Sequence, residues 1–415
     1  MRNDLVAEAA EQASSVVDLA QELIRRPSRG GIDDYAPVLA VLESWLTGRS
    51  LPHRRLHDEQ GQLVGLLVEI AGGRPGRWWA LDACVDTAPF GDEGAWSFPP
   101  TIGDVAGQWL RGRGAADSKL AASAFCHIAA DLHRDASRLK GGLAVLLDVD
   151  EHTGGFGGAR AYLADPSAER PAGVMIGYPG LDEVVVGGRG LWRAVIAVHA
   201  PAGHSGSRRL VVSAISRAAR LVQLLEEADL PAAPGDGSGF PLSAKLSVTA
   251  IRGGEGFSVT ADRCELNVDV RTTPRFDAEA AETLVRKAAA GLDAEFPGPA
   301  PTVVTPVACW PPFQLQPDEQ PVAALMAAAN VMGLAVRAKV AGPSNIGNLL
   351  AGHGDGIPAT AGFGVPYEGL HGIDERASLA ELPQVYAVYR QAVLDLLGAP
   401  LSCLDTSRVP VRSHP

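Results

Sequence analysis

Two segments of the chain are apolar on both faces, and this feature restricts its possible folds more than any other. RWWALDACV (77–85) and GLAVLLDV (142–149) each predict a strand of a sheet that is covered on both sides. Helical patterns occupy 3–27, 34–48 and the connecting segment 116–133. Since strands here alternate with helices, the sequence indicates an α/β sandwich.

The pattern changes near the Gly-rich segment 187–190, where the order becomes β-α-β-β-α over 191–293. That order suggests a small ferredoxin-like module. A proline-rich segment then resembles an exit linker, after which helical patterns return. We therefore expect a catalytic domain with a second domain inserted into it. The expected segments are a first catalytic part at 1–188, a lid and dimerisation domain at 189–303, a second catalytic part at 304–400, and a tail at 401–415.

The charge of the chain excludes two classes of partner. The 415 residues carry a formal net charge of −12, which opposes binding to nucleic acid or to anionic membranes. No apolar run approaches the roughly 20 residues that span a bilayer. The amphipathic N-terminal segment also lacks the continuous apolar core of a signal peptide. Five scattered cysteines indicate no disulfide framework, so we expect a cytoplasmic protein.

Four loops that follow strands or open helices are rich in reactive side chains. They are CVDTAP (84–89), GRGAADSK (112–119), DEHTGG (150–155) and GLHGIDE (369–375). Together they supply Cys, Asp and His side chains with a spare Glu, which is a ligand set for a transition metal with a possible general base. Taken singly, each has an ordinary explanation: Asp117 as a helix N-cap, Cys84 as a small buried side chain, His152 as a turn residue.

The order of these motifs resembles that of a clan of zinc metallopeptidases and amidohydrolases. Its members include succinyl-diaminopimelate desuccinylase, acetylornithine deacetylase, aminoacylase-1 and glutamate carboxypeptidase. The most specific match is GRGAADSK (112–119), and the resemblance runs from about residue 15 to 397. Further matching stretches are LIRRPS (23–28), WSFPP (96–100), GYPG (177–180), AGHSG (202–206) and DVRTTP (269–274). The resemblance implies an α/β/α catalytic domain of the zinc-exopeptidase type, with an inserted ferredoxin-like α+β lid.

The chain departs from the clan at the metal-ligand positions. By motif position the first metal would be held by Cys84, Asp117 and Tyr178, where the clan has His, Asp and a carboxylate. The second would be held by Asp117, His152 and His371, where the clan has Asp, Glu and His. Two imidazoles and a carboxylate remain a sound zinc site, and the same set suits non-haem iron. We therefore expect one zinc ion, or another divalent metal, rather than two.

Three further roles follow from the resemblance. Glu151 matches the general base, Asp86 matches the residue that orients a first-metal ligand, and His204 matches a lid histidine that stabilises the oxyanion, often in the other subunit of a dimer. Because Cys84 replaces the usual partner of Asp86, the role of Asp86 is an open question. The resemblance also implies a homodimer that forms through the lid.

Substrate contacts are expected at three further places. Ser344 and Asn345 lie in GPSNIGN (342–348), where the clan has a Gly-rich substrate loop. Arg271 corresponds to a lid arginine that can bind a substrate carboxylate, although a structural role at a strand end is equally compatible. Tyr178 is also a candidate for this group.

The leading hypothesis is a hydrolase that cleaves the amide bond of an N-acyl amino acid or a short peptide. Metal-bound water attacks the carbonyl, and Glu151 transfers the proton. Two alternatives stay open. A repurposed enzyme of the same fold could perform acyl transfer or condensation in a biosynthetic pathway, with Cys84 as a nucleophile. The other is a non-catalytic binding protein.

Overall fold

The computed structural model describes residues 2–207, 212–231 and 239–398, which form two compact units. Within the described residues, the first unit comprises 2–186, 315–339 and 353–398, and the second comprises the described parts of 187–314 and 340–352. The expected tail at 401–415 and Cys403 lie outside the described residues. The boundary after the inserted segment lies at 314 rather than at 303, and residues 340–352 also join the second unit.

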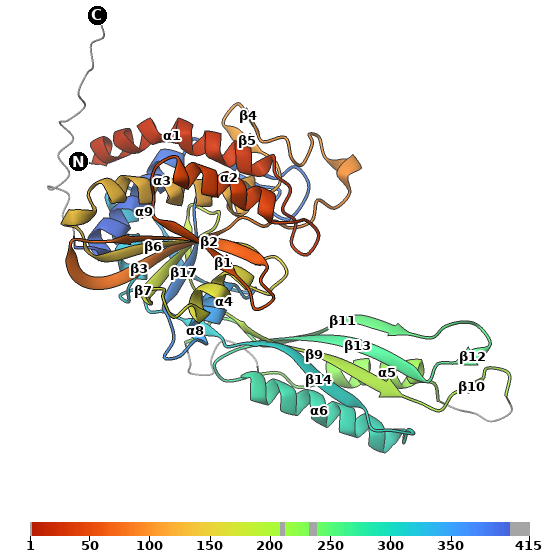
Figure 1. Ribbon diagram of the computed structural model, residues 1–415. Coiled ribbons are helices and arrows are strands. Elements are labelled where there is room, and N and C mark those ends of the chain that lie inside the picture. The colour runs from red at the N-terminus through yellow and green to blue at the C-terminus, as the bar shows by residue number, and fades with distance from the viewer. Residues whose placement is uncertain (1, 208–211, 232–238, 399–415) are drawn as a thin grey trace, which may run out of the picture. The chain divides into compact units, whose positions relative to one another are not determined.

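A nine-stranded sheet has most of its strands in the first unit (Figure 1). Strands β3, β6, β7 and β17 run parallel, so their carboxyl ends lie at one edge. The order is β1 (His53–His57), β2 (Leu63–Ala71), β6 (Lys140–Asp148), β3 (Arg74–Cys84), β7 (Pro171–Gly177), β17 (Ala359–Phe363), β8 (Glu183–Gly188) and β15 (Phe313–Gln314), with β16 (Arg337–Ala341) paired to β8.

Helices cover both faces of this sheet, which explains why its inner strands are mostly apolar. In Figure 1, α1, α3 and α9 lie on one face and α4 on the other. The central strands β6 and β7 are almost entirely buried. The helices are α1 (Arg2–Ile24), α2 (Ala36–Thr47), α3 (Leu120–Arg134), α4 (Gly157–Ala164), α7 (Val322–Val331) and α9 (Leu382–Leu396). The predicted α/β/α class is therefore confirmed.

A small antiparallel sheet in the first unit carries the loop that contains His371. Its order is β18 (Tyr367–Glu368), β19 (Arg376–Ser378), β5 (Trp109–Arg111) and β4 (Asp104–Ala106). Pairing of Arg376 with Arg111 brings the C-terminal motif next to the segment that precedes GRGAADSK. Two motifs that are distant in sequence are thus joined by backbone hydrogen bonds.

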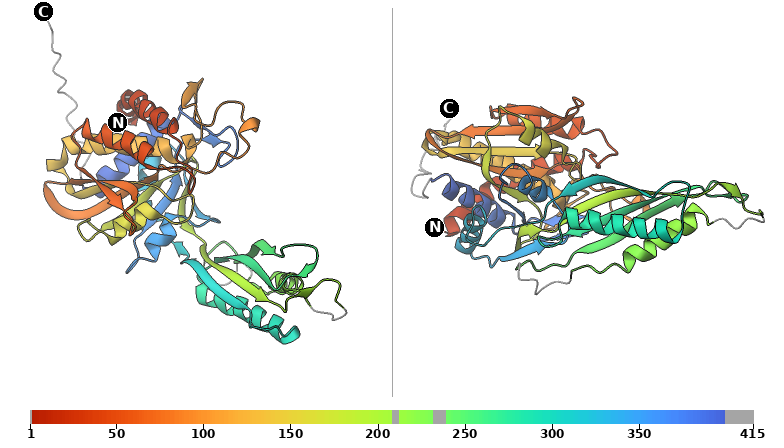
Figure 2. Two further views of the ribbon diagram at one scale, coloured as in Figure 1. Left: turned by 45° about the vertical axis from the view of Figure 1, so that its right-hand side comes forward. Right: turned by 90° about the horizontal axis from the view of Figure 1, so that it is seen from below.

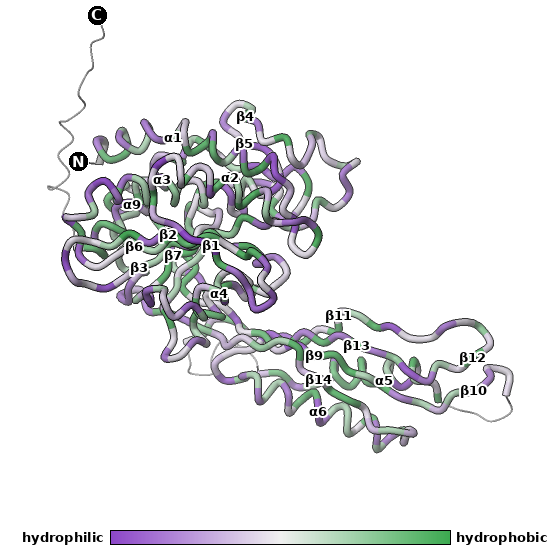
Figure 3. Tube along the Cα trace, viewed as in Figure 1, coloured by the Kyte–Doolittle hydropathy of each residue, from purple (hydrophilic) through white to green (hydrophobic). Residues whose placement is uncertain are grey.

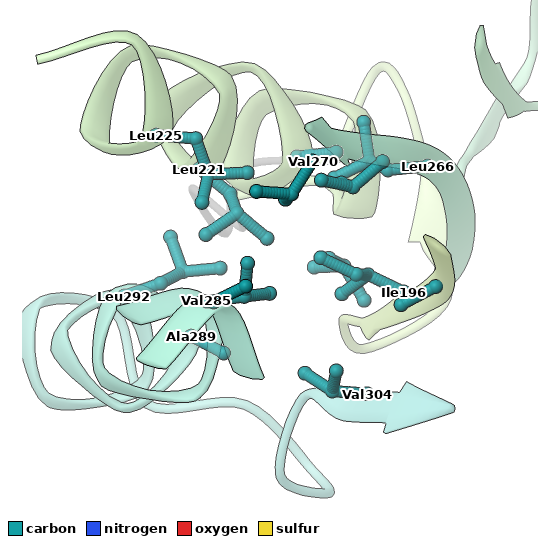
Figure 4. Packing of buried hydrophobic residues seen from close by; sticks show 14 of the residues in the cluster. Ile196, Leu221, Leu225, Leu266, Val270, Val285, Ala289, Leu292 and Val304 are labelled. Carbon is teal, nitrogen blue, oxygen red and sulfur yellow. The ribbon is translucent and has the colours of Figure 1, made fainter. Parts of the chain in front are cut away.

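The second unit contains a four-stranded antiparallel sheet with two helices on one face (Figure 2). The sheet order is β11 (Lys245–Gly253), β13 (Arg263–Thr272), β9 (Gly190–His199) and β14 (Val303–Trp310), and the helices are α5 (Ala214–Glu226) and α6 (Ala278–Glu295). Figure 4 shows Leu221 and Leu225 of α5 meeting Val285 and Leu292 of α6 over the sheet. A short α8 (Ile346–Ala351) and the pair β10 (Gly203–His204) and β12 (Val259–Thr260) complete the unit.

One expectation about this unit is wrong. The proline-rich segment that we expected to be a linker contains β14, which completes a β-α-β-β-α-β order. Pro306 is tolerated because β14 is an edge strand, and the register shifts between Pro306 and Ala308. The amphipathic pattern of α6 was easier to recognise, since hydrophobic and hydrophilic residues alternate along it (Figure 3).

Candidate metal centre

Reactive side chains of the first unit gather at the carboxyl edge of the large sheet. Cys84 ends β3, and the loop after β6 carries Glu151 and His152. Asp117 lies in the irregular turn Ala115–Lys119 before α3, with backbone angles of φ −123° and ψ 94° that are not helical. His371 comes from the loop between β18 and β19 and has a φ of 57°.

Three of these side chains converge closely enough to share one ion. His371 Nε2 lies 2.8 Å from Asp117 Oδ2, and His152 Nε2 lies 3.4 Å from the same oxygen. The three ligand atoms all lie within 4.8 Å of one another. A zinc ion with bonds of about 2.0–2.1 Å holds tetrahedral ligand atoms roughly 3.3 Å apart, so the observed spacing fits a metal.

The ring of His152 is buried, and neither ring nitrogen has a hydrogen-bond partner within the described part of the chain. Buried polar atoms are normally satisfied, so two such atoms in one ring indicate a missing partner. Nε2 faces Asp117, whereas Nδ1 lies 3.4 Å from Asp86 Oδ2. This geometry suits a metal on the Nε2 side and a carboxylate acceptor on the Nδ1 side.

Asp86 is fully buried and holds the loop after β6 in place. Its Oδ1 accepts the backbone N–H of Glu151 at 3.2 Å, and its Oδ2 accepts that of His152 at 3.0 Å. Gly30 covers the other side, where an added Cβ would lie 3.1 Å from the Cβ of His152 and 3.3 Å from Asp86 Oδ2. The position of His152 is therefore fixed from two sides.

The electrostatics of the cluster call for positive charge. Burial alone would raise the pKa of Asp117, but His152 and His371 hold that pKa well below its usual range. Burial alone would lower the pKa of His152, but Asp117 and Asp86 outweigh burial and raise it to about 11. The carboxylates thus favour a positive charge at this point, and a divalent cation would supply one.

Glu151 and Cys84 flank the cluster. Burial, together with the charge of Asp117, raises the pKa of Glu151 to about 7. Burial and the nearby carboxylates, Asp117 first among them, raise the pKa of the Cys84 thiol well above its usual value. Cys84 Sγ lies 3.9 Å from Asp117 Oδ1, and Cys84, Glu151 and His152 form a second group within ligand distance. Tyr178 is half-buried after β7, and burial raises the pKa of its phenol.

Two carboxyls beneath the cluster were missed by sequence reasoning. Asp82 and Asp148 lie in β3 and β6 and are almost fully buried. Burial raises the pKa of Asp82 to about 7, and burial with the charge of Asp82 raises that of Asp148 well above its usual value. The pair therefore does not carry two full charges at neutral pH. In the sequence, this pair could have been found from the acidic residue that lies inside each of two otherwise apolar strands.

Four candidate residues belong to the second unit, where they have partners of their own. His204 is exposed on β10, and its Nδ1 accepts the N–H of Gly206 at 3.0 Å. Asn345 caps α8 by accepting the N–H of Gly347 at 2.8 Å. The other two, Arg271 and Ser344, contact each other.

Arg271 is held mainly by an acidic neighbour. Its Nε donates to Asp269 Oδ1 at 2.7 Å, and its Nη1 donates to the Ser344 hydroxyl at 3.2 Å. Ser344 in turn donates to the backbone carbonyl of Arg189 at 2.8 Å. Arg271 thus has the structural role that the sequence analysis allowed, because it pairs with Asp269. The other side of its guanidinium lies beside the Ser344 hydroxyl.

Among the described residues, no helix is both long and apolar enough to cross a bilayer.

Comparison with known proteins gives consistent matches over most of the chain. Residues 80–395 match the family described as "Peptidase family M20/M25/M40". Among curated relatives, succinyl-diaminopimelate desuccinylase from Phenylobacterium zucineum is 27% identical, with 91% of this chain and 97% of that protein covered. The same enzyme from Cereibacter sphaeroides is 25% identical, with 91% and 98% covered.

Solved structures share the fold at lower sequence identity. The di-peptidase Dug1p from Saccharomyces cerevisiae superposes with a TM-score of 0.75 at 12% identity, covering 96% of this chain and 99% of that one. Aminopeptidase PepT from Bacillus cereus superposes with a TM-score of 0.72 at 17% identity, covering 92% of this chain and 98% of that one. The protein YXEP from Bacillus subtilis is described as a dinuclear metal-binding peptidase. It superposes with a TM-score of 0.69 at 17% identity, covering 94% of this chain and 100% of that one.

Proposed function

Because the chain belongs to peptidase family M20/M25/M40, we propose that it is a metal-dependent hydrolase that cleaves the amide bond of an N-acyl amino acid or a short peptide. Its relatives by sequence are desuccinylases, and its structural neighbours include an aminopeptidase and a di-peptidase. The observation that carries the proposal is the convergence of Asp117, His152 and His371, with Glu151 beside them.

We propose that these three residues hold one zinc ion. Two imidazoles and one carboxylate leave an open coordination position, as catalytic zinc sites require. When bound, the ion supplies a Lewis acid that polarises a carbonyl and lowers the pKa of a water molecule. A second ion at the clan's first-metal position would need Cys84 and Tyr178, and the pKa of each is raised, which opposes the charged form that binds metal. Other divalent metals also suit this donor set.

Glu151 is the proposed general base. Its carboxylate is partly buried at the edge of the cluster, with Oε2 3.6 Å from His152 Nδ1. A pKa raised to about 7 lets the group accept a proton at neutral pH and release it afterwards to the leaving nitrogen. Asp86 has a supporting role: its Oδ2 lies 3.4 Å from His152 Nδ1, and a proton held on that side would leave Nε2 free as the ligand.

The four residues of the second unit are proposed to contact the substrate. Since His204 Nδ1 accepts a backbone N–H, the neutral ring carries its proton on Nε2 and can donate to a carbonyl oxygen. Arg271, held by Ser344 through its Nη1, offers its remaining N–H groups to a substrate carboxylate that would lie beside both residues. Asn345 uses its side-chain oxygen to cap α8, which leaves its amide N–H groups for the substrate.

The acyl-transfer alternative has no comparable support. A nucleophilic cysteine needs a lowered pKa, which neighbouring cations normally provide. Around Cys84 the nearby charges are carboxylates, and its pKa is raised. We therefore favour hydrolysis.

We further propose a cytoplasmic homodimer formed through the second unit, with no nucleic-acid or membrane partner. The four described cysteines are free, which suits a reducing compartment. The sheet of the second unit has two edge strands, β11 and β14, and an edge strand is a template for pairing with another chain.

A single substitution tests the proposed base. Against a panel of N-succinyl and N-acetyl amino acids and dipeptides, Glu151→Gln should lower kcat by about 10²–10⁴-fold. Zinc content should stay unchanged, because Glu151 is not one of the three proposed ligands. Glu59→Gln, at an exposed turn between β1 and β2, is the control and should keep full activity. Retention of activity by Glu151→Gln would remove this residue from the mechanism.

A further inference from the structure

Asp117 and His371 must be brought together from distant parts of the chain. They are separated by 254 positions in sequence, yet their side chains lie 2.8 Å apart. His371 is on an irregular loop, and its side chain is 49% exposed, so packing around the ring restrains it only in part. Some other contact must hold the His371 loop against the turn that carries Asp117.

Glu375, four residues after His371, makes this contact from the side of the His371 loop. Its carboxylate is fully buried. A single oxygen, Oε1, accepts three backbone donors of the Asp117 turn: the N–H groups of Gly114 at 3.0 Å, Ala116 at 3.0 Å and Asp117 at 3.3 Å. The backbone of Asp117 is therefore hydrogen-bonded directly to the loop that carries His371.

Arg113 makes the reciprocal contact from the side of the Asp117 turn. Its Nη1 donates to Glu375 Oε2 at 2.6 Å, and its Nη2 donates to the carbonyl of Gly372, next to His371, at 2.6 Å. The guanidinium is 2% exposed and lies 5.1 Å from the ring centroid of Trp96. Both charges are thus removed from water and engaged on more than one side, which makes their geometry well defined.

A second contact on the same loop provides a natural comparison. Asp374 accepts the backbone N–H of Ser97 at 2.8 Å and its hydroxyl at 2.9 Å. This contact ties the His371 loop to the segment near Trp96, not to the Asp117 turn. Beside the backbone pairing of β19 with β5, two side-chain anchors therefore hold this loop, and the anchor made by Arg113 and Glu375 spans both ligand-bearing segments.

We propose that the buried Arg113–Glu375 ion pair positions Asp117 and His371 relative to each other and so sets the affinity of the metal centre. The inference rests on the proposed function, because it takes these two residues as metal ligands. Neither Arg113 nor Glu375 is among the three proposed ligands, and both contact the backbone of the ligand loops. The pair is a positioning device. Its loss should therefore lower the zinc affinity of the chain, in addition to any general loss of stability.

The test is the zinc affinity of the full chain, measured by competition with a chelator, together with the melting temperature of the metal-free protein. Arg113→Lys keeps the charge but lacks the two-pronged guanidinium that reaches both acceptors. It should weaken zinc binding by about 10–100-fold, as loss of a supporting contact typically does. Ser97→Ala removes one bond of the other anchor and should change zinc affinity by less than about two-fold.

A second variant covers the case in which Arg113→Lys fails to fold. Glu375→Gln keeps a carbonyl oxygen for the three backbone donors but removes the charge that pairs with Arg113, and it should weaken zinc binding in the same direction. A lower melting temperature with unchanged zinc affinity in the variant that folds would show a purely structural pair and overturn the inference. If the unmodified chain binds no zinc, the proposed function itself fails, and that result is distinct from the previous one.

Discussion

His152 shows how much of this site depends on single side chains. Asp86 lies on one side of the imidazole, Gly30 leaves room on another, and Asp117 faces the nitrogen proposed to bind metal. The ring therefore has little freedom to move without breaking one of these contacts. Well-packed interiors tolerate added volume poorly.

Gly30→Ala tests this packing. The new methyl group would lie 3.1 Å from the Cβ of His152, closer than ordinary contacts, and His152 and Asp86 would have to shift. We expect weaker zinc binding and a loss of about 1–3 kcal/mol in the free energy of unfolding, measured by chemical denaturation. Gly256→Ala is the matched control, because an added Cβ there meets nothing within 4 Å. Unchanged zinc affinity in Gly30→Ala would show that the loop adjusts freely.

At this scale the sequence identified residue types better than their partners. The motifs named Asp117, His152 and His371, and these side chains do converge. The sequence could not show that Asp86 faces His152 or that Asn345 caps α8, because such contacts depend on loop geometry. Nor could it show that Arg271 pairs with Asp269, a contact between alternate residues of one strand.

Secondary-structure elements were predicted well where the hydrophobic pattern is clear, as a continuous apolar run or as a helical period. The covered strands β3 and β6 lie within a few residues of the expected ranges, and α6 was expected at nearly its full length. The helix expected from residue 116 begins at Leu120 instead. The reason is tertiary: Glu375 accepts the N–H groups at the start of this segment, which holds the turn around Asp117 out of helical geometry.

The same logic explains the error at β14. Its side chains alternate only weakly between buried and exposed positions, and Pro306 usually argues against a strand. Only the pairing with β9 makes this segment a strand, and pairing between distant segments is not visible in a local pattern.

Helix α6 offers a stabilising change. Gly291 lies in its interior at an exposed position, and an added Cβ would meet nothing within 4 Å. Alanine loses less conformational freedom than glycine on entering a helix, so Gly291→Ala should raise the free energy of unfolding by about 0.5–1 kcal/mol. Denaturation followed by circular dichroism measures the effect. A lower free energy of unfolding would contradict this prediction, because it would mean that the added methyl group meets another atom.

At the scale of the whole molecule, the two units divide the proposed functions between them. All three proposed metal ligands lie in the first unit, and the proposed dimer surface lies in the second. Metal binding and assembly should therefore be separable. The division was readable from the sequence because the Gly-rich segment near 187 marks its start, whereas its end was hidden by β14.

Sedimentation tests the assembly. We expect a particle of about twice the 43.2 kDa chain mass at micromolar concentration, both before and after treatment with a chelator. The mass should not depend on metal, because the ligands are outside the unit that pairs. A monomer under both conditions would refute dimerisation and with it any role of His204 across subunits.

The central claim is that amide hydrolysis depends on one metal ion held by Asp117, His152 and His371. Adding zinc back to the chelator-treated protein while measuring hydrolysis tests it most directly. Activity should be absent without metal and should rise in proportion to added zinc, with a plateau near one equivalent per chain. Full activity in the metal-free protein would contradict the account, and its loss on Cys84→Ala would then assign the chemistry to a covalent acyl-enzyme mechanism.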